Sequence, residues 1–168
     1  GTVVVYPQGA AAKVDLTTLR TGDLIVVDAN NVVLAVLRKG SENSYLVELP
    51  SEPYGYVLAW LRNNSDDQSV VLDCYPNCPG LRIFFESEDC VGQAFVSNPS
   101  YLYKAPDGTW LAPSEQTTSI PQVTLSSFSG GVCSNVEIAD SSRYIIFPYT
   151  PPLEITNAVY PIRATQLE

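Results

Sequence analysis

The sequence predicts an all-β protein, an antiparallel β-sandwich or barrel of short strands that disulfides join. Three observations support this prediction. About a dozen apolar or alternating runs recur at intervals of about 8–12 residues, which is typical of all-β domains. The runs are separated by turn-forming residues, with 10 Gly and 13 Pro among 168 residues, and no stretch has the period of a long helix. The chain also carries four cysteines and no histidine.

The first β-prone run stands apart from the others. It consists of Thr2, Val3, Val4, Val5 and Tyr6. Because a proline and a glycine follow it directly, we divide the chain into a detached strand at 1–9 and a single β domain at 10–168. Two lobes that meet near residue 66 are the alternative. The detached strand could fold back on its own domain or be donated to an adjacent subunit, since an added strand satisfies an open sheet edge.

The remaining runs are interpreted as short strands linked by tight turns. Ala29-Asn30-Asn31 favours a hairpin because asparagine tolerates left-handed backbone angles, and the segments 106–108 and 129–131 are turns rich in glycine. Residues 13–20 are expected to form a loop or a single turn. The predicted strands cover residues 24–28, 32–37, 45–49, 54–61, 69–73, 81–86, 93–96, 101–104, 109–111, 122–125, 132–136, 143–147 and 154–160.

The four cysteines are Cys74, Cys78, Cys90 and Cys133. An even number fits two disulfides, and four cysteines allow three pairings. We favour Cys90–Cys133 across a long loop and Cys74–Cys78 across a short one. Free thiols or a bound metal are the alternatives, although the spacing matches no zinc motif. Disulfides would place the protein in an oxidising environment, secreted and extracellular or at a cell surface.

The composition indicates a folded chain with a strongly acidic surface. Hydrophobic residues make up 45% of it, charged residues 16%, and the net charge is −9. This charge argues against nucleic acid or an anionic membrane as a partner, because both are bound through basic faces. No apolar stretch is long enough to span a membrane. Since the chain begins at Gly1 and lacks Met, we expect that a residue, a signal peptide or an upstream domain has been removed.

The absence of histidine excludes serine–histidine and cysteine–histidine catalysis. Glu86 and Glu88 could act as paired carboxylates, but adjacent acids at the end of a strand usually form a solvated corner. The same acids with Asp89, or Asp66 with Asp67, could bind calcium through their oxygens, although no EF-hand loop is present. We therefore expect no enzyme activity and no cofactor, with calcium kept as an alternative.

Aromatic residues are the remaining candidates for binding. The chain has 10 Tyr and 2 Trp, whose flat apolar rings with polar tips stack on sugars and fill protein interfaces. They can equally serve as core or cross-strand packing. The candidates for glycan stacking are Tyr54, Tyr56, Trp60, Tyr101, Tyr103 and Trp110.

Four short motifs carry a resemblance to a known family. They are VVDAN at 26–30, FFESEDCVGQAF at 84–95, GVCSN at 131–135 and YPIR at 160–163. Together they resemble a poorly characterised exported bacterial module, which is β-rich and forms the C-terminal part of secreted, collagen-like or tail-fibre-like proteins. That family has a D-A-N-G hairpin, an F-x-S-x-D-C-x-G corner and a second cysteine downstream. The chain departs from it at Asn31, where the pattern has Gly, and the pair Cys74 and Cys78 lies outside the pattern.

The resemblance implies an extracellular, disulfide-bonded β module without enzyme activity. We therefore expect a structural protein, a subunit of a surface fibre or filament whose partner is another copy of itself. The alternative is an adhesin or fibre-tip module that binds surface glycans or a receptor. In the first case, residues 2–6 would form the subunit contact by strand exchange.

Overall fold

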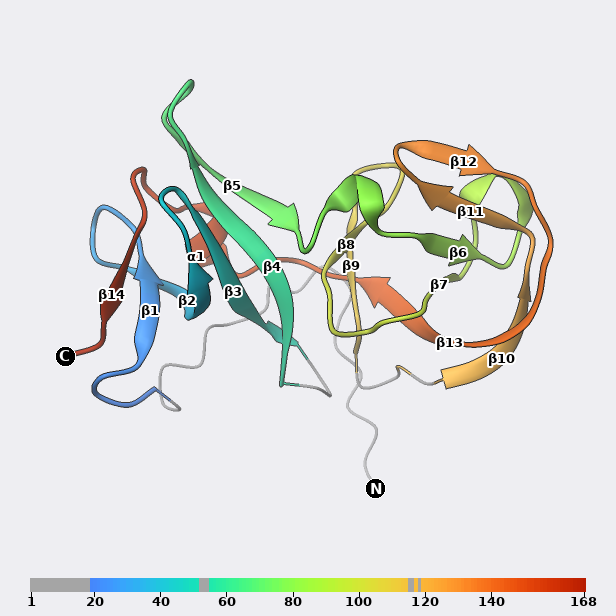
Figure 1. Ribbon diagram of the computed structural model, residues 1–168, viewed down its shortest axis with the longest axis horizontal. Coiled ribbons are helices and arrows are strands. Elements are labelled where there is room, and N and C mark those ends of the chain that lie inside the picture. The colour runs from blue at the N-terminus through green and yellow to red at the C-terminus, as the bar shows by residue number, and fades with distance from the viewer. Residues whose placement is uncertain (1–18, 52–54, 115–116, 118) are drawn as a thin grey trace.

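The computed structural model describes residues 19–51, 55–114, 117 and 119–168, and it consists mainly of two antiparallel β-sheets (Figure 1). The sheets form a sandwich or half-barrel, and two disulfides link parts of the chain. The predicted all-β, disulfide-linked fold is therefore confirmed. The predicted strand at residues 2–6, most of the segment 13–20 and Tyr54 lie outside the described residues.

The first sheet has six strands in the order β14-β1-β2-β3-β4-β5. Although β1 and β3 each bury three consecutive residues, part of the sheet shows the alternation expected when one face is buried. In β4, for example, Val57, Ala59 and Leu61 are fully buried and pack with Val47 and Leu49 of β3. The strands are β1 (Leu24–Val27), β2 (Val33–Gly40), β3 (Ser44–Ser51), β4 (Gly55–Asn64), β5 (Ser69–Cys74) and β14 (Arg163–Gln166).

The predicted β1–β2 hairpin is confirmed, and a buried carboxylate holds it. Asp28 accepts hydrogen bonds from the backbone N–H groups of Asn30, Val32 and Val159 at 2.9, 3.0 and 3.1 Å. Asn31 takes the left-handed conformation, with φ 61°. Burial alone would raise the pKa of Asp28, but these three bonds outweigh it and lower the pKa. Asp28 thus ties the hairpin to the segment before β14.

The second sheet has eight strands in the order β12-β11-β6-β7-β13-β9-β8, and β10 pairs with β13. Most of these strands have only two to four residues. The predicted turns at 106–108 and 129–131 lie in its hairpins, with positive φ at Gly108, Gly130 and Gly131. The strands are β6 (Ile83–Phe85), β7 (Ala94–Val96), β8 (Tyr103–Lys104), β9 (Trp110–Ala112), β10 (Ser119–Thr124), β11 (Ser126–Ser129), β12 (Val132–Ser134) and β13 (Ile138–Pro148).

The hairpin of β8 and β9 joins the two sheets. Leu102 and Ala112 point into the core of the first sheet, whereas Tyr103 and Leu111 belong to the core of the second. The preceding segment also forms a parallel bridge with β4, in which Leu58 donates to Ser100 O at 2.8 Å and accepts from Leu102 N at 3.1 Å. One short hairpin therefore contributes side chains to both cores.

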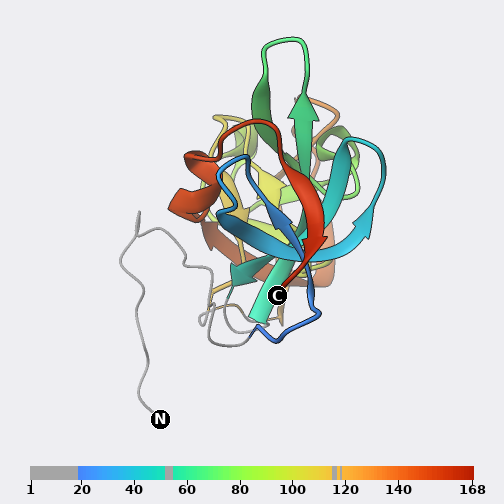
Figure 2. The ribbon, with the colours of Figure 1, turned by 90° about the vertical axis from the view of Figure 1, so that its left-hand side faces the viewer.

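The structure corrects the sequence prediction near the C-terminus. Residues 154–160 are not a strand; they contain the single helical turn α1 (Leu153–Thr156) and the irregular segment that follows it. Two prolines precede α1, and proline cannot donate to a sheet ladder. The chain then forms β14, which was not predicted and which pairs with β1 along the edge of the first sheet (Figure 2). Among the described residues, no helix is long and apolar enough to cross a membrane.

Candidate functional site

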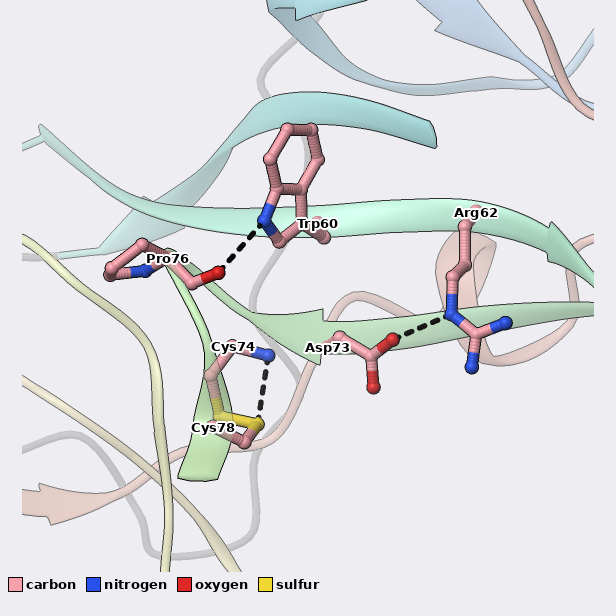
Figure 3. Close-up of polar contacts among 6 residues, drawn as sticks. All are labelled: Trp60, Arg62, Asp73, Cys74, Pro76 and Cys78. Carbon is pink, nitrogen blue, oxygen red and sulfur yellow. Dashed lines mark hydrogen bonds and ion pairs between the residues drawn. A yellow bond between two sulfur atoms is a disulfide. The ribbon is translucent and has the colours of Figure 1, made fainter. Parts of the chain in front are cut away.

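A shallow hollow of about 240 Å³ opens where β4 and β5 meet the loop after β5. It is lined by Trp60, Asp73, Cys74, Pro76, Asn77 and Cys78. Figure 3 shows these residues except Asn77, together with Arg62.

The strand register brings the hollow's two main side chains together. Trp60 of β4 and Asp73 of β5 are direct cross-strand partners, so both project from the same face of the sheet. Arg62, two residues further along β4, donates from Nε to Asp73 Oδ2 at 2.7 Å. Both members of this ion pair have side chains that are 41% exposed. The hollow thus combines an indole, a carboxylate and, at its rim, a guanidinium group.

A small covalent loop forms the opposite wall. The predicted Cys74–Cys78 disulfide is present, with Cα atoms 4.7 Å apart, and Cys74 N donates to Cys78 Sγ at 3.0 Å. Trp60 Nε1 donates to the backbone oxygen of Pro76 at 3.3 Å, which fixes the orientation of the indole (Figure 3). The loop at 74–78 and the indole of Trp60 are therefore fixed relative to one another.

The structure brings together only two of the aromatic residues that the sequence suggested for glycan stacking. Trp60 and Tyr101 lie on either side of Tyr75, with both pairs of ring centroids 5.5 Å apart in edge-on geometry. Tyr75 is not among the residues predicted to bind glycans, although its position next to Cys74, inside the short disulfide loop, indicates that it lies near Trp60. Tyr56 lies beneath Arg38, whose guanidinium is 5.4 Å from the ring.

Tyr103 and Trp110 take other roles. Tyr103 is only 3% exposed, its hydroxyl donates to Asn98 O at 2.7 Å, and burial raises its pKa. It is a core residue, so its ring offers no face to a sugar. Trp110 packs against the first core and carries Lys104 Nζ 5.2 Å above its ring. Tyr54 lies outside the described residues.

The acidic corner around Cys90 is held by its own polar contacts. Glu86 Oε1 accepts from Gln93 N at 3.1 Å, and Asp89 and Asn135 exchange two hydrogen bonds of 2.7 and 2.8 Å. Gly92 has φ 89°, and an added Cβ would lie 2.9 Å from Glu86 Cγ, so the corner requires glycine there. Within the part of the chain that the structure describes, no group of three or more Asp, Glu or Cys side chains is arranged to hold a metal ion.

A second candidate surface is the edge strand β12. The predicted Cys90–Cys133 disulfide joins it to the corner at Glu88–Cys90, with Cα atoms 6.0 Å apart. Val132 on β12, Val91 after the corner and Val136 beyond β12 are 62%, 57% and 55% exposed. Among the described strands, β12 pairs only with β11. One backbone edge of β12 therefore has no strand partner in the described fold.

No family model, curated protein or solved structure matches this chain.

Proposed function

We propose that the protein is a non-enzymatic structural subunit of an extracellular fibre or filament, in which residues 2–6 of one copy add as a strand to β12 of the next. The observation that carries this proposal is the β12 edge, which has no partner among the described strands, carries no charge, and has exposed valines on it and beside it. Open strand edges bind extended segments through backbone hydrogen bonds.

The other edge strands are less suited to accept a strand. Natural proteins protect sheet edges with charged side chains, and such residues occur on β14, β5 and β8 as Arg163, Asp73 and Lys104. The sequence of β12, Val-Cys-Ser, has no charge and no proline. A fifth edge strand, β10, pairs only with β13 among the described strands and has no charge, but it contains Pro121, which cannot donate to an added strand. Among these five edges, β12 alone has neither a charge nor a proline.

The β12 edge is also held rigidly. Its central residue is fixed by the Cys90–Cys133 disulfide, and Asn135 just beyond it is fixed by its two hydrogen bonds to Asp89. A partner that docks on a rigid edge need not order it, which lowers the entropic cost of association. The rigidity thus favours strand addition here.

The sequence of residues 2–6 suits the role of the added strand. It is uncharged and rich in β-branched valine. Copies with a net charge of −9 repel one another, so contact through two uncharged segments meets the least repulsion. When extended, residues 7–18 can reach about 40 Å, which is sufficient to reach a neighbouring copy.

The two disulfides support the proposed extracellular location. Such bonds persist in oxidising compartments and are rare where thiols are kept reduced. A fibre outside the cell would retain both.

Deletion of residues 1–9 tests the proposal. Sedimentation velocity should show oligomers or polymers for the full chain and monomers for the deletion variant. A monomeric full chain, or a deletion variant that still polymerises, would contradict strand donation.

A matched pair of substitutions tests the acceptor edge. Val132→Glu should abolish assembly by placing a charge on the β12 edge. Val159→Glu makes the same change of charge at a residue that is 42% exposed and follows α1, and it should assemble like the unaltered chain. Equal assembly by the two variants would exclude β12 as the acceptor.

A further inference from the structure

We propose that the hollow at Trp60 binds one ring of a neutral saccharide. This site is separate from the β12 edge and uses different residues, so the inference does not depend on strand addition. It follows from four features of the hollow: its aromatic wall, its unused polar groups, its rigidity and its size.

Two polar side chains of the hollow have hydrogen-bonding atoms that no described residue contacts. Asp73 Oδ2 accepts from Arg62, but the second carboxylate oxygen, Oδ1, accepts no hydrogen bond from a described residue. The exposed Asn77 side chain likewise makes no hydrogen bond within the described part of the chain, although its backbone oxygen accepts from Gly80 and Leu81. An acceptor and a mixed donor–acceptor therefore face the same hollow, as vicinal hydroxyl groups require.

The apolar wall complements the other side of a sugar ring. A pyranose presents C–H groups on its faces and hydroxyl groups around its rim, and aromatic rings bind such amphipathic surfaces. The Trp60 indole supplies the ring, and Asp73, its cross-strand neighbour, supplies an acceptor beside it. This arrangement suits a ligand that is both flat-faced and hydroxylated.

The lining argues against two other ligand classes. Arg62 at the rim is paired with Asp73 and is not among the lining residues, so the Asp73 carboxylate and the net charge of −9 disfavour an anion. A purely apolar ligand would leave Asp73 and Asn77 without partners. At about 240 Å³, the hollow is smaller than the sites of about 300 Å³ or more that hold drug-sized ligands. It therefore accommodates a single ring, such as the terminal residue of a glycan.

The site needs little ordering before it binds. The Cys74–Cys78 disulfide fixes one wall, and the bond from Trp60 Nε1 to Pro76 fixes the indole against it. Weak ligands such as sugars gain most from a site whose side chains are already in place.

The chain's two tryptophans allow a direct test. In a Trp110→Phe variant, the fluorescence reports on Trp60 alone. This variant is titrated with glucose, galactose, mannose and N-acetylglucosamine up to about 50 mM, in the millimolar range expected for a single weakly bound ring. At least one sugar should change the fluorescence saturably, with the same Kd that saturation-transfer NMR gives for the unaltered chain.

Two variants locate the binding. Trp60→Phe is the same substitution as Trp110→Phe, and because it removes the fluorescent reporter it is followed by saturation-transfer NMR. It should weaken binding about fivefold or more, a loss in the range of one aromatic contact. Asn77→Ala changes an exposed loop side chain and should weaken binding about threefold while leaving the thermal unfolding curve unchanged. Binding that Trp60→Phe and Asn77→Ala leave unaltered would place the sugar elsewhere and overturn the assignment. Failure of all four sugars to bind, or binding only of sialylated glycans, would overturn the neutral-saccharide class.

Discussion

The two sheets reach stability by different means. The first has long ladders, with strands β2, β3 and β4 of 8, 8 and 10 residues, and its only disulfide closes a short loop at its margin. The second is built mainly from strands of two to four residues, and the Cys90–Cys133 disulfide connects elements 43 residues apart in sequence. We expect the longer ladders of the first sheet to need a covalent link less than the short strands of the second do.

The burial pattern varies between individual strands, since β1 and β3 of the first sheet each bury three consecutive residues, as β6 of the second does. In β4, buried and partly exposed residues alternate, as expected for a sheet with one covered face. In β6, three consecutive residues, Ile83–Phe85, are buried. The outer one, Phe84, is covered by Arg143, whose guanidinium carbon lies 3.8 Å from the ring centroid. The cation over this ring is buried, whereas Arg38, which lies over Tyr56 in the first sheet, is exposed.

The largest expected difference concerns the two disulfides. Replacing Cys90 and Cys133 by serine should lower the free energy of unfolding by about 4 kcal/mol, and replacing Cys74 and Cys78 by about 2 kcal/mol, because the entropy restored to the unfolded chain grows with loop length. Urea unfolding of both double variants measures this. Equal losses would show that the second sheet does not rely on its long-range link.

The second largest effect on the free energy of unfolding is expected at Asp28, whose carboxylate holds the β1–β2 hairpin of the first sheet. Asp28→Ala should cost about 3 kcal/mol, because it leaves the partly buried N–H groups of Asn30, Val32 and Val159 without their charged acceptor.

The stabilisation by Asp28 should also depend on pH. Since its pKa in the folded state lies below the ordinary value of 3.8, its contribution is complete above that value and is lost as the pH falls through the folded pKa. Urea unfolding from pH 7 down to pH 2 should show this loss in the unaltered chain and a smaller one in Asp28→Asn. Identical pH profiles would contradict the role given to the carboxylate.

A smaller effect is expected from two buried serines, one in each region. Ser126 Oγ accepts from Cys90 N at 2.9 Å and donates to Ser87 O at 2.6 Å, whereas Ser51 Oγ only donates, to Pro113 O at 3.0 Å. Ser126→Ala should therefore cost about 2 kcal/mol and Ser51→Ala about 1 kcal/mol. Thermal unfolding compares them, and the reverse order would mean that the two hydrogen bonds of Ser126 contribute little to the corner at Cys90.

The smallest effect is expected for the ion pair of Arg62 and Asp73. Because both side chains are 41% exposed, the coupling energy from a double-mutant cycle should be about 0.5 kcal/mol and should fall as salt is added. A coupling above about 1.5 kcal/mol would show that the pair supports the first sheet as strongly as a buried contact does.

Features set by local chemistry could be predicted from the sequence. The hairpins at Asn31, Gly108 and Gly131 follow from residues that accept positive φ, and the observed pairing of the cysteines is the one favoured among the three that four cysteines allow. The strands β11 and β14 could not be predicted, because Ser-Ser-Phe-Ser and Arg-Ala-Thr-Gln lack an apolar alternation and become strands only by pairing with β6 and β1. The segment 154–160 misled the prediction, since its apolar residues suit a strand but follow two prolines.

The candidate site was predictable only in part. Trp60 was a candidate from its residue type, but its neighbours Asp73 and Asn77 were not. Their proximity depends on the β4–β5 register and on the loop that the Cys74–Cys78 disulfide closes. Tyr103, which resembles the exposed tyrosines in sequence, is buried because β8 lies between the two cores.

The hairpin of β8 and β9 should make the two sheets unfold together. If this hairpin detaches, the first core loses Leu102 and Ala112, and the second core loses Tyr103 and Leu111. Neither half can lose its structure without taking side chains from its neighbour, so the two halves are thermodynamically coupled. Calorimetry should record one endotherm, with equal van't Hoff and calorimetric enthalpies, despite the contrast in architecture.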